Sequence, residues 1–345
     1  MMTILATPLR SVATSSKTRP ALSWQESLRR AIRDPVQLCR SLQLPPKYEQ
    51  AATQASQLFG VFVPREYLGR MKVGDEKDPL LRQVLPIAEE AETGKGFSLD
   101  PVGDADALMA PGLLHKYHSR VLLIASGACA VHCRYCFRRH FPYEQMPHGL
   151  EDWQPAIEQI DEDTTIEEVI LSGGDPLMLT DPRLAELVDC LEPIKHLNCL
   201  RIHTRLPVMI PSRVTDSLLS LLSDGRLRPV VVVHINHPAE IDSLVEASLT
   251  RLAEAGIMLL NQSVLLRGVN DSAEVLIALA KQLVELRVMP YYLHQLDRTL
   301  GTSHFEVPVE TGISIIQQMR SRLPGYAVPR FVEEIPGAAS KHVLA

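Results

Sequence analysis

The sequence lacks the features that mark membrane proteins and nucleic-acid-binding proteins. None of its apolar runs reaches the ~18 residues that a membrane-spanning helix needs. Basic residues are in the minority, with 35 Lys and Arg against 41 Asp and Glu and a formal net charge of −6, and they form no stripe. Because nucleic-acid binders carry a concentrated basic footprint, we exclude a nucleic-acid partner together with a membrane location.

What remains is the composition of an ordinary globular protein. Apolar residues make up 46% and charged residues 22% of the 345 residues, which argues against a disordered or collagen-like chain. At roughly 150 residues per domain, the length predicts two domains, or one large α/β barrel with an appendage.

The six cysteines are not spread along the chain as in a disulfide-bonded scaffold. Three of them, Cys129, Cys133 and Cys136, fall within eight residues. This clustering indicates a metal centre in a reducing compartment, and we therefore expect a cytoplasmic protein. Three thiolates on one compact loop suit a 4Fe-4S cluster that keeps one iron without a protein ligand. The alternative is a zinc ion with His132 or His140 as fourth ligand, although zinc sites usually use two separated pairs of ligands.

The N-terminal part of the chain is predicted to be helical. Residues 1–22 contain basic and hydroxyl side chains and no acidic ones, a composition typical of transit peptides and of loosely held N-terminal arms, and we expect an arm. Residues 23–110 show amphipathic patterns, with one helix beginning at Trp24 and another over Pro79–Ala91. Since no reactive side chains cluster there, we interpret residues 23–110 as a helical N-terminal region.

Short apolar runs alternate with helical patterns in the centre of the chain, mostly about 30 residues apart. Such spacing is typical of repeated βαβ units around a parallel sheet. It predicts an open doubly wound sheet or a partial (β/α)6 barrel over residues 111–300, followed by a C-terminal segment over residues 301–345. The six runs are Val121–Ile124, Val169–Leu171, Leu200–Ile202, Val230–Val233, Met258–Leu260 and Met289–Leu293.

Polar segments follow several of these predicted strands. Gly173 and Gly174 follow the second run, and paired glycines let a backbone approach a ligand closely. Further polar segments lie at residues 203–208, 234–238 and 261–270, each at or after the end of a strand. Because the C-terminal ends of parallel strands share one edge, we expect these segments to form a common pocket.

Together these motifs resemble the lysine 2,3-aminomutase family of radical S-adenosylmethionine (SAM) enzymes. The resemblance rests on Cys-Arg-Tyr-Cys-Phe-Arg-Arg, Ser-Gly-Gly-Asp-Pro-Leu, His-Thr-Arg-x-Pro-Val and Asn-Gln-x-Val-Leu-Leu-x-Gly-Val-Asn-Asp, and it spans roughly residues 115–341. It implies a partial (β/α)6 radical-SAM barrel preceded by the helical region. It also implies a 4Fe-4S cluster on the three cysteines, whose open iron chelates SAM. The SAM-binding residues that it implies are Gly173, Gly174, Asp175, His234 and Gln262.

The resemblance also implies pyridoxal 5′-phosphate (PLP) as a second cofactor. In this family a Pro-Gly-rich loop ends in the lysine that forms a Schiff base with PLP, and Lys341 holds that place after Pro336. The family's run of glycines is here Gly337-Ala338-Ala339-Ser340, which departs from the pattern. The residues that match the family's PLP-phosphate site are Arg120, Tyr117 and Lys116, the last in place of a family arginine.

Charged residues at the family's substrate positions indicate L-lysine as the substrate. Family members that act on lysine place two acidic residues around its distal ammonium, and Asp297 and Glu334 match those positions. A desolvated ammonium needs such carboxylate partners. Arg138 matches the family arginine that pairs with the substrate carboxylate, a role that suits the bidentate guanidinium.

The C-terminal end of the sequence bears on which branch of the family it resembles. Metabolic members continue well beyond the Schiff-base lysine, whereas this sequence ends four residues after Lys341. That length resembles a short branch whose product is attached to elongation factor P by a separate ligase. We therefore expect conversion of (S)-α-lysine to (R)-β-lysine for that modification, with a reductant such as flavodoxin or ferredoxin, and the resemblance allows a homo-oligomer. A metabolic lysine 2,3-aminomutase and a non-catalytic iron–sulfur scaffold stay open as alternatives.

Overall fold

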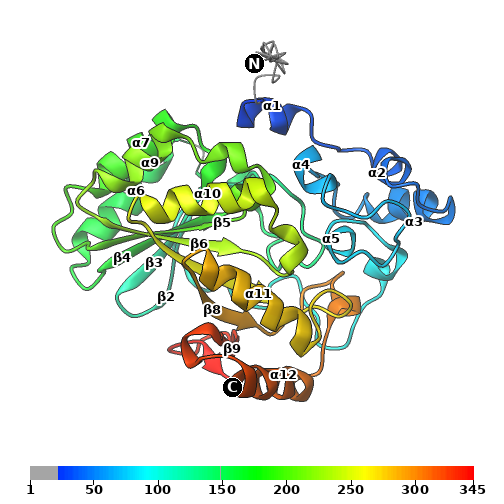
Figure 1. Ribbon diagram of the computed structural model, residues 1–345. Coiled ribbons are helices and arrows are strands. Elements are labelled where there is room, and N and C mark those ends of the chain that lie inside the picture. The colour runs from blue at the N-terminus through cyan, green and yellow to red at the C-terminus, as the bar shows by residue number, and fades with distance from the viewer. Residues whose placement is uncertain (1–21, 148) are drawn as a thin grey trace, which may run out of the picture.

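Six consecutive parallel strands form the centre of the molecule (Figure 1). The computed structural model describes residues 22–147 and 149–345, so the arm expected over residues 1–22 lies outside the described residues except for Leu22. All six expected strands are present. They are β3 (Arg120–Ser126), β4 (Glu168–Gly173), β5 (Cys199–Thr204), β6 (Arg228–His234), β7 (Met258–Val264) and β8 (Val288–His294).

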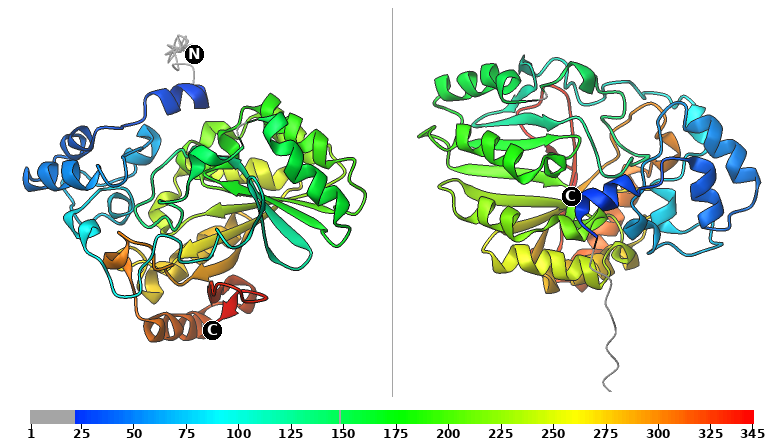
Figure 2. Two further views of the ribbon diagram at one scale, coloured as in Figure 1. Left: turned by 180° about the vertical axis from the view of Figure 1, so that it is seen from behind. Right: turned by 90° about the horizontal axis from the view of Figure 1, so that it is seen from above.

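Helices lie between successive strands and cover the outer face of the sheet (Figures 1 and 2). Their buried side chains, such as Leu187 and Leu249, join outward strand residues such as Ile202 in one hydrophobic core. The alternation of strand and helix confirms the partial (β/α) barrel. The helices between the strands are α6 (Leu150–Glu162), α7 (Asp181–Leu191), α8 (Leu206–Met209), α9 (Asp216–Ser223), α10 (Ser243–Glu254) and α11 (Ala273–Glu285), and α12 (Val309–Arg322) follows β8.

Four short strands extend the sheet at both ends, and the sequence did not predict them. Strands of two to five residues show too little alternation to be recognised from their pattern. β2 pairs antiparallel with β3, whereas at the other end β9 pairs parallel with β8 and β10 antiparallel with β9. The added strands are β1 (Leu108–Ala110), β2 (Leu113–Tyr117), β9 (Arg330–Glu333) and β10 (His342–Val343).

The inner face of the barrel is polar where the strands end. Along β5, Leu200 and Ile202 are buried against the helices, while Arg201 and His203 alternate with them and face the opposite side. His234 and His294 likewise end β6 and β8. Because all of these strands run parallel, their C-terminal ends bring the histidines to one mouth of the barrel.

The helical N-terminal region lies beside this mouth and shares its core with the barrel (Figure 1). Ser23 caps the first helix, accepting a hydrogen bond from the Glu26 amide (3.3 Å). The helix expected over Pro79–Ala91 is wrong beyond Arg82. Pro86 follows, and a proline lacks the amide hydrogen that a continuing helix needs. The helices are α1 (Trp24–Arg29), α2 (Pro35–Ser41), α3 (Lys47–Ala55), α4 (Arg65–Leu68) and α5 (Pro79–Arg82), with a 3₁₀ turn at Ala88–Ala91. Among the described residues, no helix combines the length and apolar character required to span a bilayer.

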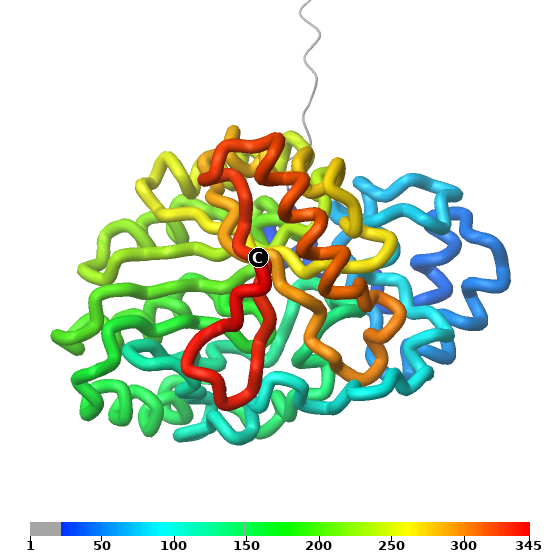
Figure 3. Tube along the Cα trace, turned by 90° about the horizontal axis from the view of Figure 1, so that it is seen from below, coloured from blue at the N-terminus to red at the C-terminus, as the bar shows by residue number. Residues whose placement is uncertain are grey.

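Residues 334–341, which we call the lateral strip, connect β9 to β10 and reach the opposite end of the sheet (Figure 3). The Tyr117 hydroxyl of β2 donates a hydrogen bond to Glu334 Oε1 (2.5 Å). Pro336 packs close to Gly103, where a Cβ would come within 3.2 Å of the proline Cβ. The lateral strip therefore joins the first and last parts of an open sheet.

Candidate active site

The three clustered cysteines lie on the loop that follows β3, at the mouth of the barrel. Their thiols are close enough to influence one another. Burial and the neighbouring Cys136 and Cys133 raise the pKa of Cys129 well above its usual range, and burial with Cys133 raises the pKa of Cys136 to about 11. Several buried thiolates would repel one another without a bound cation, and iron supplies that charge. The loop therefore suits an iron–sulfur cluster.

Among the described residues, the zinc alternative has no gathered set of ligands. His132 Nδ1 pairs with the Gly60 carbonyl (3.0 Å), and His140 Nε2 pairs with the Leu300 carbonyl (3.1 Å). Within residues 22–147 and 149–345, no three His, Cys, Asp or Glu side chains gather closely enough to hold a single metal ion. In a cluster each thiolate binds a different iron, so wider spacing of the cysteines is what a cluster needs.

The helical N-terminal region holds this loop through a buried ion pair. Glu90 accepts hydrogen bonds from Arg134 Nε (2.8 Å) and Arg139 Nη2 (2.7 Å), and all three side chains are almost completely buried. Arg134 also donates to the carbonyls of Phe59 (2.8 Å) and Gly60 (3.0 Å). The two arginines flank Cys136 in the sequence, so Glu90 fixes the chain on both sides of that cysteine.

Glu90→Gln is expected to lower the free energy of unfolding by ~3–5 kcal/mol, because it leaves two buried guanidinium groups without their shared counter-charge. Urea unfolding of the wild type and the variant measures this difference. Glu89→Gln, at the exposed neighbouring position, is the matched control and should change stability by less than ~0.5 kcal/mol. Equal effects of the two substitutions would show that the ion pair of Glu90 with Arg134 and Arg139 does not stabilise the fold.

The Gly-Gly motif packs directly on the cysteine loop. The Gly174 amide donates to the Ser126 carbonyl (2.7 Å), and the Asp175 amide donates to the Ala128 carbonyl (2.8 Å). A Cβ on Gly174 would lie only 2.3 Å from the Ala128 oxygen. The close approach expected for these glycines is therefore an approach to the chain's own loop.

Gly174→Ala is expected to displace the loop and reduce iron uptake, because the new methyl group meets backbone that cannot move aside on its own. We expect at least a severalfold lower iron-to-protein ratio after anaerobic reconstitution. Gly325→Ala serves as the control, since no atom lies within 4 Å of its added Cβ. Full iron content in Gly174→Ala would show that the packing is not needed.

Asp175 organises the motif from within. Its carboxylate accepts hydrogen bonds from the Thr204 hydroxyl (2.8 Å) and from the amides of Arg205 (2.7 Å) and Leu177 (3.0 Å). The side chain is 4% exposed. Asp175 thus connects the ends of β4 and β5, and its contacts are made within the chain.

The remaining residues expected to bind SAM lie in the mouth of the barrel. His234 Nε2 and the Gln262 side-chain amide are 2.8 Å apart. Burial and Arg205 lower the pKa of His234 to about 3, so its ring is neutral at pH 7. His203 and His294 each carry a buried Nε2 without a hydrogen-bond partner among the described residues. Such unpaired polar atoms suit a site that receives a polar ligand.

Lys341 donates a hydrogen bond to Glu334 and forms an ion pair with it on the lateral strip. The Glu334 side chain is 9% exposed and the Lys341 side chain 24%. Lys116 lies 3.9 Å from the same carboxylate. The residues matched to the PLP-phosphate site are also at this place, and the Arg120 guanidinium stacks 4.9 Å from the Tyr117 ring centroid.

Asp104 links two of the expected ligand-binding cations. It pairs with Lys116 Nζ (2.7 Å) and Arg138 Nε (2.7 Å) and is almost fully buried. Burial acts to raise its pKa, but the Arg138 guanidinium and Lys116 ammonium lower it below the usual value. Arg138 also donates to the Ser172 hydroxyl (3.3 Å), which places the guanidinium beside the Gly-Gly motif.

Asp297 follows β8, and its carboxyl group is influenced by the charges of Lys341 and Glu334. Burial raises its pKa to about 7, against the lowering effect of Lys341, while Glu334 adds to the increase. A carboxyl group with so high a pKa lacks a strong cationic partner of its own. It is therefore suited to receive a cation from a ligand.

Three buried groups of the site were not singled out from the sequence: Asp104, Glu90 and Glu240. Asp104 and Glu90 lie in the N-terminal region, far from the motifs in sequence, so no local spacing identifies them. In contrast, some polar residues expected to line the pocket hold the fold together. Asn261 Oδ1 accepts from the Ile235 amide (2.9 Å), and Asn270 Nδ2 donates to the Asn236 carbonyl (3.0 Å).

Comparison with known proteins gives the class of this site. Residues 118–200 match the 4Fe-4S single cluster domain family. L-lysine 2,3-aminomutase from Haemophilus influenzae is 44% identical over 95% of this chain and 97% of its own length. The enzyme of that name from Escherichia coli is 43% identical over 93% and 94%, and that from Clostridium subterminale is 36% identical over 92% and 76%. A solved radical SAM methyltransferase from Sphaerobacter thermophilus has a TM-score of 0.48 at 19% identity and covers 64% of this chain and 68% of its own.

The chain belongs to the radical SAM enzymes that carry a 4Fe-4S cluster. Within that class it is a member of the lysine 2,3-aminomutase family, whose enzymes are isomerases.

Proposed function

We propose that this protein is an aminomutase of the EpmB (YjeK) type, which converts (S)-α-lysine to (R)-β-lysine for attachment to elongation factor P by a separate ligase. A flavodoxin or ferredoxin would supply the electron, and the reduced thiolates suit the cytoplasm. The chain is more similar to the E. coli enzyme, at 43% identity, than to the clostridial one, at 36%, which supports the E. coli type of enzyme.

The observation that carries the proposal for lysine is the ion pair between Glu334 and Lys341. A lysine side chain ends in the same primary ammonium as the substrate, so the pair supports Glu334 as a partner for the substrate's distal ammonium. If the Lys341 amine were engaged with PLP, the Glu334 carboxylate would be available to pair with the distal ammonium of a bound lysine. Asp297 would provide the second carboxylate.

The chain's own residues suit the remaining tasks. Cys129, Cys133 and Cys136 would hold the cluster, and Gly173, Gly174, His234 and Gln262 would line the adjoining SAM site. Lys341 would hold PLP, whose ring supplies an extended π-system that stabilises a substrate radical.

The substrate carboxylate and the PLP phosphate need cationic groups. Arg138, fixed by Asp104, would bind the substrate carboxylate through its fork of N–H groups. Arg120, Tyr117 and Lys116 would surround the PLP phosphate. Lys116 also pairs with Asp104, so one buried carboxylate orients cations for both ligands.

An anaerobic assay tests this function. The protein is reconstituted with iron, sulfide and PLP, reduced, and supplied with SAM and L-lysine, and the amino acids are separated by chiral chromatography. We expect (R)-β-lysine. If SAM is cleaved but lysine is recovered unchanged, the cluster is functional and the assignment of lysine as the substrate is wrong.

The elongation factor P role is tested in cells by mass spectrometry. Deletion of the gene should remove the β-lysyl mass from elongation factor P, and the wild-type gene should restore it. An unchanged mass, together with free β-lysine formation in vitro, would favour a metabolic aminomutase instead.

A further inference from the structure

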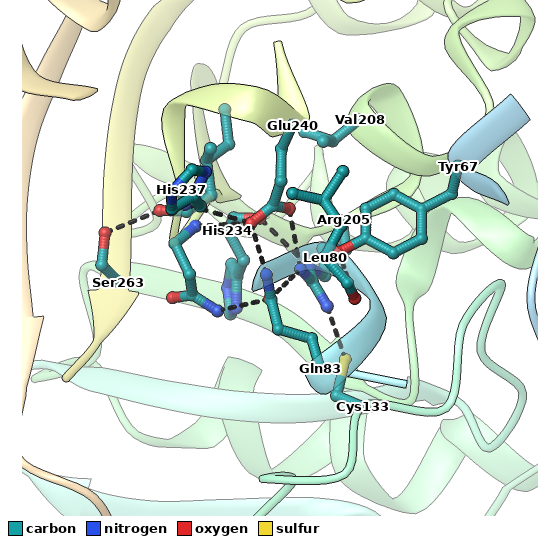
Figure 4. Close-up of polar contacts among 12 residues, drawn as sticks. Tyr67, Leu80, Gln83, Cys133, Arg205, Val208, His234, His237, Glu240 and Ser263 are labelled. Atoms are coloured by element: carbon teal, nitrogen blue, oxygen red, sulfur yellow. Dashed lines mark hydrogen bonds and ion pairs between the residues drawn. The ribbon is translucent and has the colours of Figure 1, made fainter. Parts of the chain in front are cut away.

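Arg205 lies in contact with one of the clustered cysteines and with a buried carboxylate (Figure 4). Its Nη1 is 2.9 Å from Cys133 Sγ, and its Nη2 is 2.8 Å from Glu240 Oε2. The Arg205 side chain is 7% exposed and the Glu240 side chain is fully buried. The buried Arg205 guanidinium therefore lies between the Cys133 sulfur and the Glu240 carboxylate, and little water reaches either charge.

Several parts of the chain fix this arrangement. Gln83, directly after α5, accepts from Arg205 Nη2 (2.7 Å) and donates to Glu240 Oε1 (3.1 Å). Asn236 donates to both Gln83 (3.0 Å) and the Tyr135 hydroxyl (2.7 Å). Because every partner is itself buried and hydrogen-bonded, the guanidinium has little freedom to leave the sulfur. Its backbone amide is held in addition by Asp175 (2.7 Å).

We propose that Arg205 raises the reduction potential of the cluster by donating a charged hydrogen bond to the Cys133 sulfur, and that Glu240 limits this increase. Reduction adds an electron to the cluster and its sulfurs, so an adjacent positive charge stabilises the reduced form more than the oxidised form. The negative charge of Glu240 lowers the reduction potential instead, and Arg205 separates it from the sulfur. In a buried site of low dielectric both effects are strong.

The inference rests on the proposed function only in requiring that the three cysteines hold the cluster. Arg205 and Glu240 are positioning residues here, since Arg205 acts on the cluster through Cys133 and Glu240 acts through Arg205. A purely structural role predicts the same kind of damage from the loss of either residue. An electrostatic role predicts opposite shifts in potential.

The test is a redox titration of the anaerobically reconstituted full-length protein without SAM, followed by electron paramagnetic resonance. Arg205→Gln should lower the ratio of reduced to oxidised cluster at least tenfold at a fixed potential, equivalent to 59 mV for one electron. Glu240→Gln should raise that ratio. Arg205→Lys keeps the charge but not the planar fork, so its potential should fall between those of wild type and Arg205→Gln.

Arg213→Gln is the matched control. Arg213 is a buried arginine that pairs with Asp181 (2.7 Å) and donates to the Leu177 carbonyl (2.7 Å). Its loss should destabilise the fold to a similar degree without moving the potential. Iron and sulfide contents are measured for every variant.

The outcomes separate the two proposals. If the wild-type protein takes up no iron, the proposed function fails. If it carries the cluster and Arg205→Gln leaves the ratio within twofold of wild type, the role of Arg205 is refuted. If Arg205→Gln does not assemble a cluster, Glu240→Gln decides: a higher ratio supports the inference, and an equal or lower ratio overturns it.

Discussion

Asp297→Asn is expected to reduce kcat/KM for L-lysine by roughly 30- to 4,000-fold, since removing one charge of a buried ion pair costs about 2–5 kcal/mol. Asparagine keeps the size and shape of the side chain but cannot neutralise the distal ammonium of the substrate. The assay is initial-rate formation of β-lysine over a range of lysine concentrations. Asp189→Asn, at an exposed position of α7, is the control and should leave the rate unchanged.

The same substitution should make the protein more stable above pH 7. Burial raises the pKa of Asp297 from its usual 3.8 to about 7, so between these values the folded state binds a proton that the unfolded state has lost. Stability therefore falls as pH rises from about 4 to about 7, and the loss is complete above 7. At ~1.4 kcal/mol per pKa unit, Asp297→Asn should recover up to about 4 kcal/mol at pH 8 and nothing at pH 3.5.

The KM for lysine should follow the same ionisation. Binding requires the Asp297 carboxylate, so KM should rise up to tenfold per unit as pH falls below about 7. This dependence should be flat in Asp297→Asn. A variant with both normal stability at pH 8 and normal KM would show that Asp297 is an ordinary solvated carboxylate.

Lys341→Ala is expected to reduce β-lysine formation at least ~10³-fold, because it removes the amine that would form the Schiff base with PLP. Lys341→Arg should be equally inactive. It retains the positive charge and the pairing with Glu334, so it separates the amine's chemistry from its charge. Iron content should be normal in both variants, because the lateral strip makes no described contact with the cysteine loop.

Borohydride reduction provides a readout besides activity. In the wild type it should fix PLP onto the peptide that contains Lys341, and mass spectrometry should find no such label in either variant. Lys195→Ala, at an exposed lysine after α7, is the control and should label fully. Label on another lysine, or full activity of Lys341→Arg, would contradict the assignment.

The sequence predicted the strands of the barrel better than it predicted the contacts that make the site. Each long strand contains enough apolar residues to be recognised, and the Cys and Gly-Gly motifs are local. The decisive pairs are not local. Glu90 and Arg134 are 44 residues apart and Tyr117 and Glu334 are 217 apart, and no periodicity relates positions so distant. The end of α5 at Arg82 was also missed. Pro86 is a local signal for it, but the residues on both sides continue a helical pattern.

The ion pair of Glu90 with Arg134 and Arg139 also determines the shortest fragment of this chain that could fold and hold the cysteine loop. A fragment beginning at residue 111 would contain every strand from β2 onward and all three cysteines. It would lack Glu90 and the carbonyls of Phe59 and Gly60, which hold Arg134 and Arg139 in place, and it would expose the barrel's part of the shared hydrophobic core. We expect such a fragment to aggregate, so the boundary drawn from sequence patterns near residue 110 is a poor place to cut. A minimal protein must begin ahead of Phe59.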